Sequence, residues 1–316
     1  MRNPDPKSAS SARADIGARL MLVALGLIWG ITWPVMKIAL NEIPPLTMRA
    51  TAAIFGAVTY YLMCVFMRRS LRIASPKAWA HILVGSLLNI VAFSLFSPFA
   101  QLMATTSRVA ILAYTMPIWS TLLAWPFLGE RPNRVQATAL VLCATGLAIL
   151  IYPLTTNGIP LGIVFALAVG VCWGGGTVYL KWAHIEADQM GAGSWQMTIA
   201  AVILVACMLI FDGGPHFGGA HRDGILATAW TGIAGNGIAY ALWFTIIRRL
   251  PAVTASLGVL ASPVIGVIGS FLLLGEVPTA PDMIGFALIF VASACVLLTR
   301  QNAVETTSHV RDGVKV

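Results

Sequence analysis

The sequence predicts an all-α membrane protein with ten transmembrane helices that form two inverted five-helix repeats. Three observations lead to this fold class: an apolar composition, long uncharged runs, and a set of residues that occurs twice. Of the 316 residues, 58% are hydrophobic and 10% are charged. A water-soluble domain carries roughly 25% charged residues, because polar groups must cover its surface. Surrounding lipid removes that requirement, so the composition indicates one membrane domain.

The uncharged runs set the number of expected helices. A helix needs about 20 apolar residues to cross the hydrocarbon core of a bilayer. One run is too long for a single helix, and the cluster from Pro153 to Pro160 predicts a turn within it. Dividing that run gives ten helices. The runs are 20–36, 50–67, 78–107, 109–129, 135–180, 189–211, 224–247, 250–275 and 283–299.

Four segments follow from these helices. Residues 17–152 hold helices one to five and form the first repeat, and residues 160–299 hold helices six to ten and form the second. The polar ends, 1–16 and 300–316, are predicted to be disordered cytoplasmic tails. We expect no cleaved signal peptide, because the first apolar run is long enough to span and no small-residue cleavage site follows it.

Lysine and arginine residues are distributed unevenly between the two sides of the expected membrane domain. With a cytoplasmic N-terminus, 16 of the 20 fall in cytoplasmic segments, and only Lys37, Arg49, Arg108 and Arg222 fall outside. Cytoplasmic loops carry the excess of positive charge in membrane proteins. We therefore predict a multi-pass protein of the inner (plasma) membrane with both termini in the cytoplasm.

Each half of the chain holds a matching set of residues, at offsets of 144 to 147 positions. Because each half has an odd number of helices, the second copy enters the membrane upside down. Inverted repeats are typical of secondary transporters, in which two similar bundles exchange conformations and open a central site to either side. A purely structural duplication is the alternative. The set includes Trp29, Gly30, Lys37, Gly85, Asn89, Pro117, Gly129 and Glu130, matched by Trp173, Gly174, Lys181, Gly232, Asn236, Pro263, Gly275 and Glu276.

Two motifs within these repeats resemble those of a known family. A Trp-Gly pair near the end of an apolar helix has a lysine seven residues after the glycine, at Gly30 and Lys37 and again at Gly174 and Lys181. A second motif, P-x11-G-E-x-P, begins at Pro117 and recurs in the second half. Both resemble the EamA-type repeat of the drug/metabolite transporter superfamily, and within it the branch of bacterial inner-membrane exporters of aromatic and other amino acids.

That resemblance implies a ten-helix bundle with a central cavity lined by helices one, three, four, six, eight and nine. It also implies a secondary transporter that exports amino acids, with aromatic and other neutral ones among them. The motifs describe the architecture more closely than the substrate. Export of other metabolites or of cationic drugs is therefore the alternative function within the same fold.

The third and eighth expected helices carry matching stripes of one amide and two aromatic residues. Their spacing of four and then three residues places each stripe on one helical face. An amide can bond the polar end of a solute, while aromatic rings take its apolar part or a cation. The alternative is an aromatic core face with an amide that clamps two helices. The stripes are Asn89, Phe93 and Phe96, and Asn236, Tyr240 and Trp243.

Two further stripes each end in a lysine. Trp33 and Lys37 share a helical face in the first half, as do Thr177 and Lys181 in the second. We expect Trp33 and Thr177 to contribute to the substrate site. Each lysine falls at a helix end, so we expect it to reach the membrane interface and to gate or anchor the bundle.

Prolines are expected inside three helices, at Pro34, Pro117 and Pro263. An interior proline frees a backbone carbonyl and permits a kink. Carbonyls freed beside a cavity can take part in binding, so we expect Pro117 and Pro263 to have a gating role. A plain packing kink is the alternative. Tyr114 lies three residues before Pro117 and is expected to line the same cavity.

Acidic residues are absent from the expected spans. Proton-coupled carriers usually need an ionisable relay inside the membrane, so we expect a facilitator or an exchanger. Glu130 and Glu276 lie at helix ends, where they are expected to cap helices or to pair with basic groups.

The sequence indicates no cofactor, metal site or catalytic residue. It has no P-loop and no C-x-x-C pair. A membrane-embedded enzyme is the alternative of another class, but the one polar cluster, His184, Glu186 and Asp188, lacks metal-ligand spacing. The expected partners are a small-molecule substrate and membrane lipid, without nucleic acid, and we expect a monomer.

Overall fold

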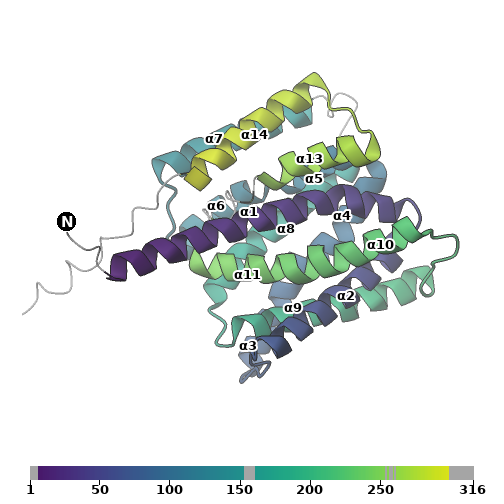
Figure 1. Ribbon diagram of the computed structural model, residues 1–316, viewed down its shortest axis with the longest axis horizontal. Coiled ribbons are helices and arrows are strands. Elements are labelled where there is room, and N and C mark those ends of the chain that lie inside the picture. The colour runs from purple at the N-terminus through teal and green to yellow at the C-terminus, as the bar shows by residue number, and fades with distance from the viewer. Residues whose placement is uncertain (1–5, 153–160, 253–254, 256–258, 260, 299–316) are drawn as a thin grey trace, which may run out of the picture.

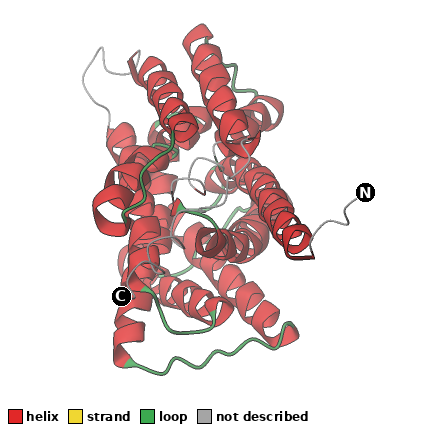
Figure 2. Ribbon diagram, turned by 90° about the vertical axis from the view of Figure 1, so that its left-hand side faces the viewer, coloured by secondary structure: helices red, strands yellow, loops and turns green. Residues whose placement is uncertain are grey.

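The structure is a computed structural model, which describes residues 6–152, 161–252, 255, 259 and 261–298. Within these ranges every element is a helix, and the longest loops between them are residues 67–75 and 213–221 (Figure 2). The helices lie side by side, and α1 runs the whole length of the bundle (Figure 1). The all-α class is therefore confirmed. The predicted turn before residue 161 and the predicted C-terminal tail lie outside the described residues.

The first half contains the elements expected for helices one to five. Its third helix contains a π-helical segment, and its fourth is interrupted after Ala113. The elements are α1 (Pro6–Leu40), α2 (Pro45–Phe66), α3 (Pro76–Ser86), η1 (Leu87–Val91), α4 (Ala92–Met103), α5 (Thr106–Ala113), α6 (Met116–Leu128) and α7 (Arg134–Ile151).

The second half follows the same order. The helix that corresponds to the third one again contains a π-helical segment, here eight residues long. The elements are α8 (Leu161–Ala183), α9 (Gln189–Cys207), η3 (Met208–Asp212), α10 (Arg222–Trp230), η4 (Thr231–Ile238), α11 (Ala239–Arg249), α13 (Ala261–Leu274) and α14 (Ala280–Leu298).

Local sequence signals set several of these helix ends. Ser75 and Asp188 accept hydrogen bonds from backbone N–H groups in the first turns of α3 and α9, and Asn133 forms a capping box at α7. Gly129 ends α6 with a φ of 69°, a left-handed conformation that glycine adopts without steric cost.

The N-terminal segment differs from its prediction. Residues 1–16 were expected to form a tail, but α1 begins at Pro6. No proline or glycine interrupts the chain between Lys7 and Ile16. Extending an existing helix is easier than starting one, because the cost of nucleation has already been met.

Pro117 and Pro263 also differ from their prediction, because neither lies in a helix interior. Pro117 stands in the first turn of α6, and Pro263 in the first turn of α13. A proline ring clashes with the carbonyl four residues earlier and lacks an N–H group, so a new helix starts more easily there than an old one continues. Pro34 does lie inside its helix, α1.

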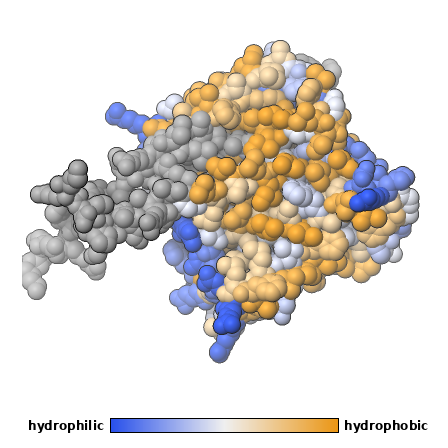
Figure 3. Space-filling model, viewed as in Figure 1, coloured by the Kyte–Doolittle hydropathy of each residue, from blue (hydrophilic) through white to orange (hydrophobic). Residues whose placement is uncertain are grey.

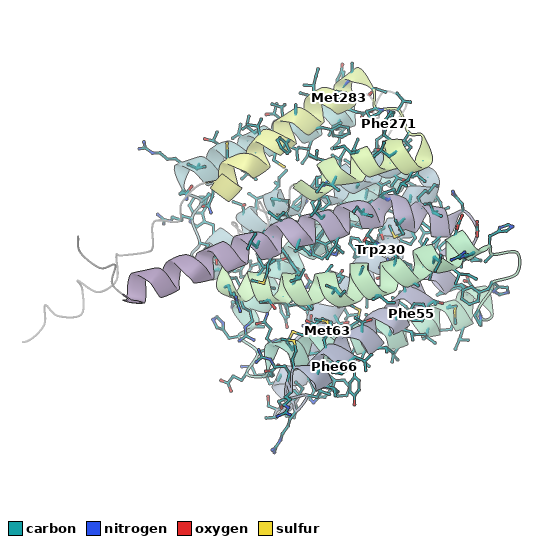
Figure 4. The ribbon with its side chains drawn as sticks, viewed as in Figure 1. Phe55, Met63, Phe66, Trp230, Phe271 and Met283 are labelled. Carbon is teal, nitrogen blue, oxygen red and sulfur yellow. The ribbon has the colours of Figure 1, made fainter. Side chains whose placement is uncertain are left out.

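In the part of the chain that the structure describes, eight helices are long and apolar enough to cross a membrane, and Ser262–Leu274 and Ala280–Ala292 are shorter apolar helices. The expected count of ten crossings remains a prediction. Figure 3 shows apolar residues over the middle of the bundle and hydrophilic residues at its two ends. Large apolar side chains on the outside of the bundle are labelled in Figure 4; among them, Phe55, midway along α2, is 37% exposed and Phe271, on α13, is 49% exposed. Such a band suits contact with lipid.

Contacts between the two halves occur in matched pairs. Helix α1 packs against α13, and its counterpart α8 packs against α6. Helix α2 contacts η4, and its counterpart α9 contacts η1. Two further contacts join counterparts directly, α2 with α9 and α7 with α14. Exchanging each element for its counterpart therefore preserves these contacts.

Matched glycines permit two of these close approaches. A Cβ atom added at Gly30 would lie 2.6 Å from Cβ of Ile265 on α13, and one added at Gly174 would lie 2.8 Å from Cβ of Trp119 on α6. Real Cβ contacts are essentially never this short. A side chain at either glycine would push the helices apart.

Candidate functional site

We name the two ends of the bundle after the two matched lysines. The Lys181 end holds the ends of α6, α8 and α11. The Lys37 end holds the end of α1 and the beginnings of α5 and α10. In Figure 1 the Lys181 end is on the left and the Lys37 end is on the right.

A small cavity, which we call the central cavity, lies within the bundle. Its volume is about 20 Å³, roughly the space that one water molecule needs. Helix two contributes to its wall, contrary to what the family resemblance implied, and no described residue of helix nine does. The lining residues are Trp29, Thr32, Trp33, Met36, Arg49, Phe93, Tyr114, Trp173, Gly235, Asn236 and Tyr240.

Aromatic rings form most of the cavity wall. The ring centroid of Trp29 lies 4.9 Å from that of Trp173 and 5.6 Å from that of Tyr240. Phe93 lies 5.9 Å from Trp173, also edge-to-face. The indole N–H of Trp29 donates to the carbonyl of Gly235 at 3.1 Å, which fixes this ring. These edge-to-face pairs favour a wall with defined ring orientations.

The two predicted amides lie in the two matched π-helical segments. Asn89 lies in η1 and Asn236 in η4. The hydroxyl of Tyr240, on α11 just after η4, donates to the backbone carbonyl of Asn89 at 2.9 Å and so joins α11 to η1. A π-helical segment within an α-helix is rare and is frequently found at functional sites. The helical periodicity of the sequence gave no sign of either segment.

Arg49 lies in a different place from the one predicted for it. It was counted among the charges outside the membrane, but its side chain is 1% exposed and lines the central cavity. Its helix begins at Pro45, before the uncharged run that starts at residue 50. The Pro44-Pro45 pair was the available signal, because proline is favoured in the first helical turn.

Five of the predicted site residues lie together. Trp33, Phe93, Tyr114, Asn236 and Tyr240 all line the central cavity. Tyr114 reaches it because the chain is interrupted between α5 and α6, just before Pro117.

The other four predicted site residues do not line this cavity. The side-chain amide of Asn89 donates to the carbonyl of Gly85 within its own helix. Phe96 turns away and stacks on Phe165 with ring centroids 5.8 Å apart. The wider π-helical turn at Asn89 changes the angular register that a constant 3.6 residues per turn assumes. Thr177 and Trp243 are fully buried on α8 and α11.

A second cavity of about 460 Å³ lies at the Lys181 end; we call it the end cavity. Along α8, Trp173 lines the central cavity and Leu180 lines the end cavity, so Thr177 occupies the turn between them. Along α11, Tyr240 lines the central cavity and Phe244 the end cavity. Trp243, next to Phe244, packs against Trp173 with ring centroids 5.7 Å apart and belongs to the same separating layer.

An ion pair lies in the wall of the end cavity. The ammonium of Lys181 lies 2.7 Å from Oε1 of Glu130, and Oε2 of Glu130 accepts from the backbone N–H of Ala252 at 2.6 Å. The prediction that Glu130 pairs with a basic group is confirmed. This carboxylate joins the end of α8 to the chain that leads into α13.

At the Lys37 end the matched glutamate makes the equivalent bond, but the matched lysine has another partner. Lys37 donates to the backbone carbonyl of Gln101 at 2.9 Å. Glu276 accepts from the backbone N–H groups of Thr106 and Ser107, at 2.9 and 3.0 Å, and so caps α5 as predicted. Gln101 is fully buried, and its amide donates to the carbonyl of Trp33 at 3.1 Å.

Comparison with known proteins gives a consistent result. The model of the EamA-like transporter family matches residues 17–152 and again residues 160–298. The uncharacterised transporter YoaV of Bacillus subtilis (strain 168) is 26% identical over 275 residues, which cover 85% of this chain and 93% of YoaV. A probable amino-acid metabolite efflux pump of Escherichia coli (strain K12) is 24% identical over 294 residues, with 86% of this chain and 91% of the pump covered.

Two further similarities concern location and fold. The uncharacterised inner membrane transporter YedA of Escherichia coli (strain K12) is 24% identical over 277 residues, which cover 88% of this chain and 89% of YedA. A protein of known crystal structure, 20% identical, superposes with a TM-score of 0.69 over 89% of this chain and 97% of its own. That similarity shows a shared fold. Because the family model matches most of the chain, in both halves, this protein belongs to the EamA-like transporter family.

Proposed function

We propose that this membrane transporter exports amino acids, aromatic and other neutral ones among them, across the inner membrane by alternating access. The observation that carries the proposal is an aromatic cavity inside the bundle, separated by one layer of side chains from a larger cavity at one end. Aromatic walls suit the apolar part of such solutes. The relative described as a probable amino-acid metabolite efflux pump supports the substrate class.

The paired contacts between the halves support an inverted repeat of ten helices. Contacts that survive the exchange of α1 with α8 and of α2 with α9 are those expected of two units related by a two-fold axis. Two such units can adopt each other's conformation, which opens the site to opposite sides in turn.

The Lys181 end is the cytoplasmic end in this proposal. Arg68, Arg69 and Arg131 lie in loops at this end, and Arg248 and Arg249 lie in the last turn of α11. Cytoplasmic loops and the helix ends beside them carry the excess of positive charge. The 460 Å³ cavity then faces the cytoplasm, the side from which an exporter receives its substrate.

Transport without a carboxylate proton relay is the coupling we propose. The residues that line the central cavity include no aspartate or glutamate. A facilitator or an exchanger needs no such relay, whereas proton-coupled carriers usually do. Cationic drugs are disfavoured among the alternative substrates, because the charged side chain in the cavity wall is that of Arg49.

Uptake by proteoliposomes tests the proposal. Purified protein is reconstituted, and counterflow of a panel of labelled amino acids and cationic drugs is measured against protein-free liposomes. We expect counterflow of aromatic amino acids and no accumulation when a pH gradient is imposed. Absence of counterflow for every amino acid would refute the substrate class, and accumulation driven by the pH gradient would refute the proposed coupling.

A further inference from the structure

Arg49 is a buried cation without an acidic partner among the described residues. One terminal nitrogen donates to the hydroxyl of Ser94 on α4, and the other lies 3.5 Å from the sulfur of Met36 on α1. Its Nε atom has no partner. The described ion pairs are formed by Arg69, Lys181 and His221 instead. A buried charge without a counter-ion is unfavourable, so its presence indicates a functional requirement.

Unpartnered hydrogen-bond donors gather at the same cavity. Besides Nε of Arg49, the indole N–H of Trp173 and the side-chain nitrogen of Asn236 have no acceptor, and all three residues line the cavity wall. A ligand that satisfies three donors must be rich in acceptors. An ionised carboxylate accepts only and offers about four lone-pair sites on two oxygens. A guanidinium also matches a carboxylate in geometry and in charge.

The rest of the wall explains what else the ligand contains. The face of Phe93 covers the guanidinium of Arg49, with Cζ 5.6 Å from the ring centroid. Trp29 and Tyr240 continue the apolar wall. The described lining holds no carboxylate that could pair with an ammonium group of the ligand. An ammonium group in this cavity would also lie near Arg49, whose positive charge repels it. The carboxylate is therefore the group that the site selects.

We propose that Arg49 binds the carboxylate of the transported solute and that organic carboxylates with an apolar remainder are the substrate class, with the α-amino group dispensable. The inference rests on the proposed function, because it assumes that the solute passes through the central cavity. The cavity of about 20 Å³ corresponds to a contracted site, which widens when the solute enters. Trp173 and Asn236 add hydrogen bonds to the same carboxylate.

Binding measured by the intrinsic tryptophan fluorescence of the purified full chain tests this assignment. The probes are phenylalanine, its desamino analogue 3-phenylpropionate and its amide phenylalaninamide. We expect 3-phenylpropionate to bind at least as tightly as phenylalanine, because Arg49 repels the ammonium group, and the amide to bind at least about tenfold more weakly than phenylalanine, a difference of about 1.4 kcal/mol or more. Equal affinity for acid and amide, or no binding of either carboxylate, would overturn the proposal.

Variants separate binding from structure. Arg49→Gln should weaken carboxylate binding at least about tenfold and should not weaken the binding of the amide. Arg69→Gln is the matched control, because Arg69 is half exposed and pairs with Asp188; its binding should equal that of the wild type. If the role of Arg49 were merely structural, Arg49→Gln would weaken the binding of the carboxylates and of the amide alike. If Arg49→Gln does not fold, Trp173→Phe, which removes only an N–H donor and part of a ring, should weaken the acid selectively.

The outcome is distinguishable from that of the proposed function. Binding of 3-phenylpropionate that depends on Arg49, together with no counterflow of any amino acid, would leave the carboxylate site standing and refute amino-acid export. Counterflow of amino acids, together with equal affinity for the acid and the amide, would leave amino-acid export standing and refute the carboxylate site.

Discussion

At the Lys181 end, the ammonium of Lys181 lies 2.7 Å from the carboxylate of Glu130 beside a cavity of about 460 Å³. At the Lys37 end, the matched Lys37 donates to the backbone carbonyl of Gln101, and the matched Glu276 caps α5. The two glutamates make equivalent bonds, because Thr106 and Ala252 are 146 residues apart, as Glu130 and Glu276 are. Only the contacts of the two lysines differ, as expected if the two repeats are in opposite states of one cycle.

A layer of side chains separates the central cavity from the end cavity. Thr177 and Trp243 lie between the central cavity and the end cavity, and both are fully buried. We interpret them as the barrier on the Lys181 side rather than as direct contacts of the solute. The predictions below alter this barrier first and then the contacts at the two ends.

The largest effect is expected for Trp243→Ala. The indole is fully buried and packs against Trp29 and Trp173. Removal of such a side chain costs roughly 3–5 kcal/mol in protein cores, so the melting temperature in detergent should fall markedly. A cysteine introduced at Thr32, on the central cavity, should react faster with a thiol reagent in this background, because the barrier is lost.

Trp182→Ala is the control for that substitution, because Trp182 is 51% exposed in the same half. It should change neither the melting temperature nor the labelling of the cysteine at position 32 by much. If Trp243→Ala lowers flux but leaves the labelling rate unchanged, Trp243 contacts the solute and the barrier interpretation is wrong.

The barrier shows where prediction from sequence reached its limit. Apolar runs and repeated motifs predicted the helical class and the family, because both depend on composition and spacing along the chain. The predicted faces of helices three and eight assume a constant 3.6 residues per turn. The π-helical segments at Asn89 and Asn236 break that assumption, so Phe96 faces Phe165 and Trp243 lies in the barrier.

Arg49 and Pro117 illustrate a second limit. The expected spans are uncharged runs, so any charged residue, Arg49 included, is predicted to lie outside them. Its burial depends on Ser94 and Met36, which come from other helices and are invisible to any local pattern. Pro117 was predicted to lie inside a helix and to permit a kink there. In the structure it lies in the first turn of a new helix, and the interruption before it brings Tyr114 to the cavity.

The next effect concerns the matched glutamates. Glu130→Gln leaves the half-buried Lys181 without its charged partner, whereas Glu276→Gln removes only the charge of a helix cap. A hydrogen bond to a charged group contributes about 1.5–3 kcal/mol. We expect both variants to melt earlier and only Glu130→Gln to lose most of its counterflow, since only the Glu130 carboxylate also pairs with the lysine on α8. Equal loss of counterflow in both would contradict a difference between the ends.

A third prediction compares accessibility at equivalent positions. Ala100 and Ile247 are 147 residues apart and correspond in the two repeats. Ile247 is 3% exposed but lines the end cavity, whereas Ala100 is 0% exposed and lines neither of the two cavities described above. In a background without the native cysteines, Ile247→Cys should react with a hydrophilic thiol reagent at least about tenfold faster than Ala100→Cys, a preference of about 1.4 kcal/mol. Equal rates would show that both ends open equally often.

The smallest effect is expected for Thr177→Val. The hydroxyl of Thr177 donates to the carbonyl of Trp173 at 2.9 Å within its own helix, and such a local bond contributes at most about 1 kcal/mol. Valine keeps the shape, so the barrier should persist and counterflow should change less than about twofold. Thr198→Val is the matched control, because Thr198 makes the same bond to Ser194 at 2.8 Å on α9. A tenfold loss confined to Thr177→Val would place this hydroxyl on the solute's path, and the central cavity would then have to extend beyond Trp173.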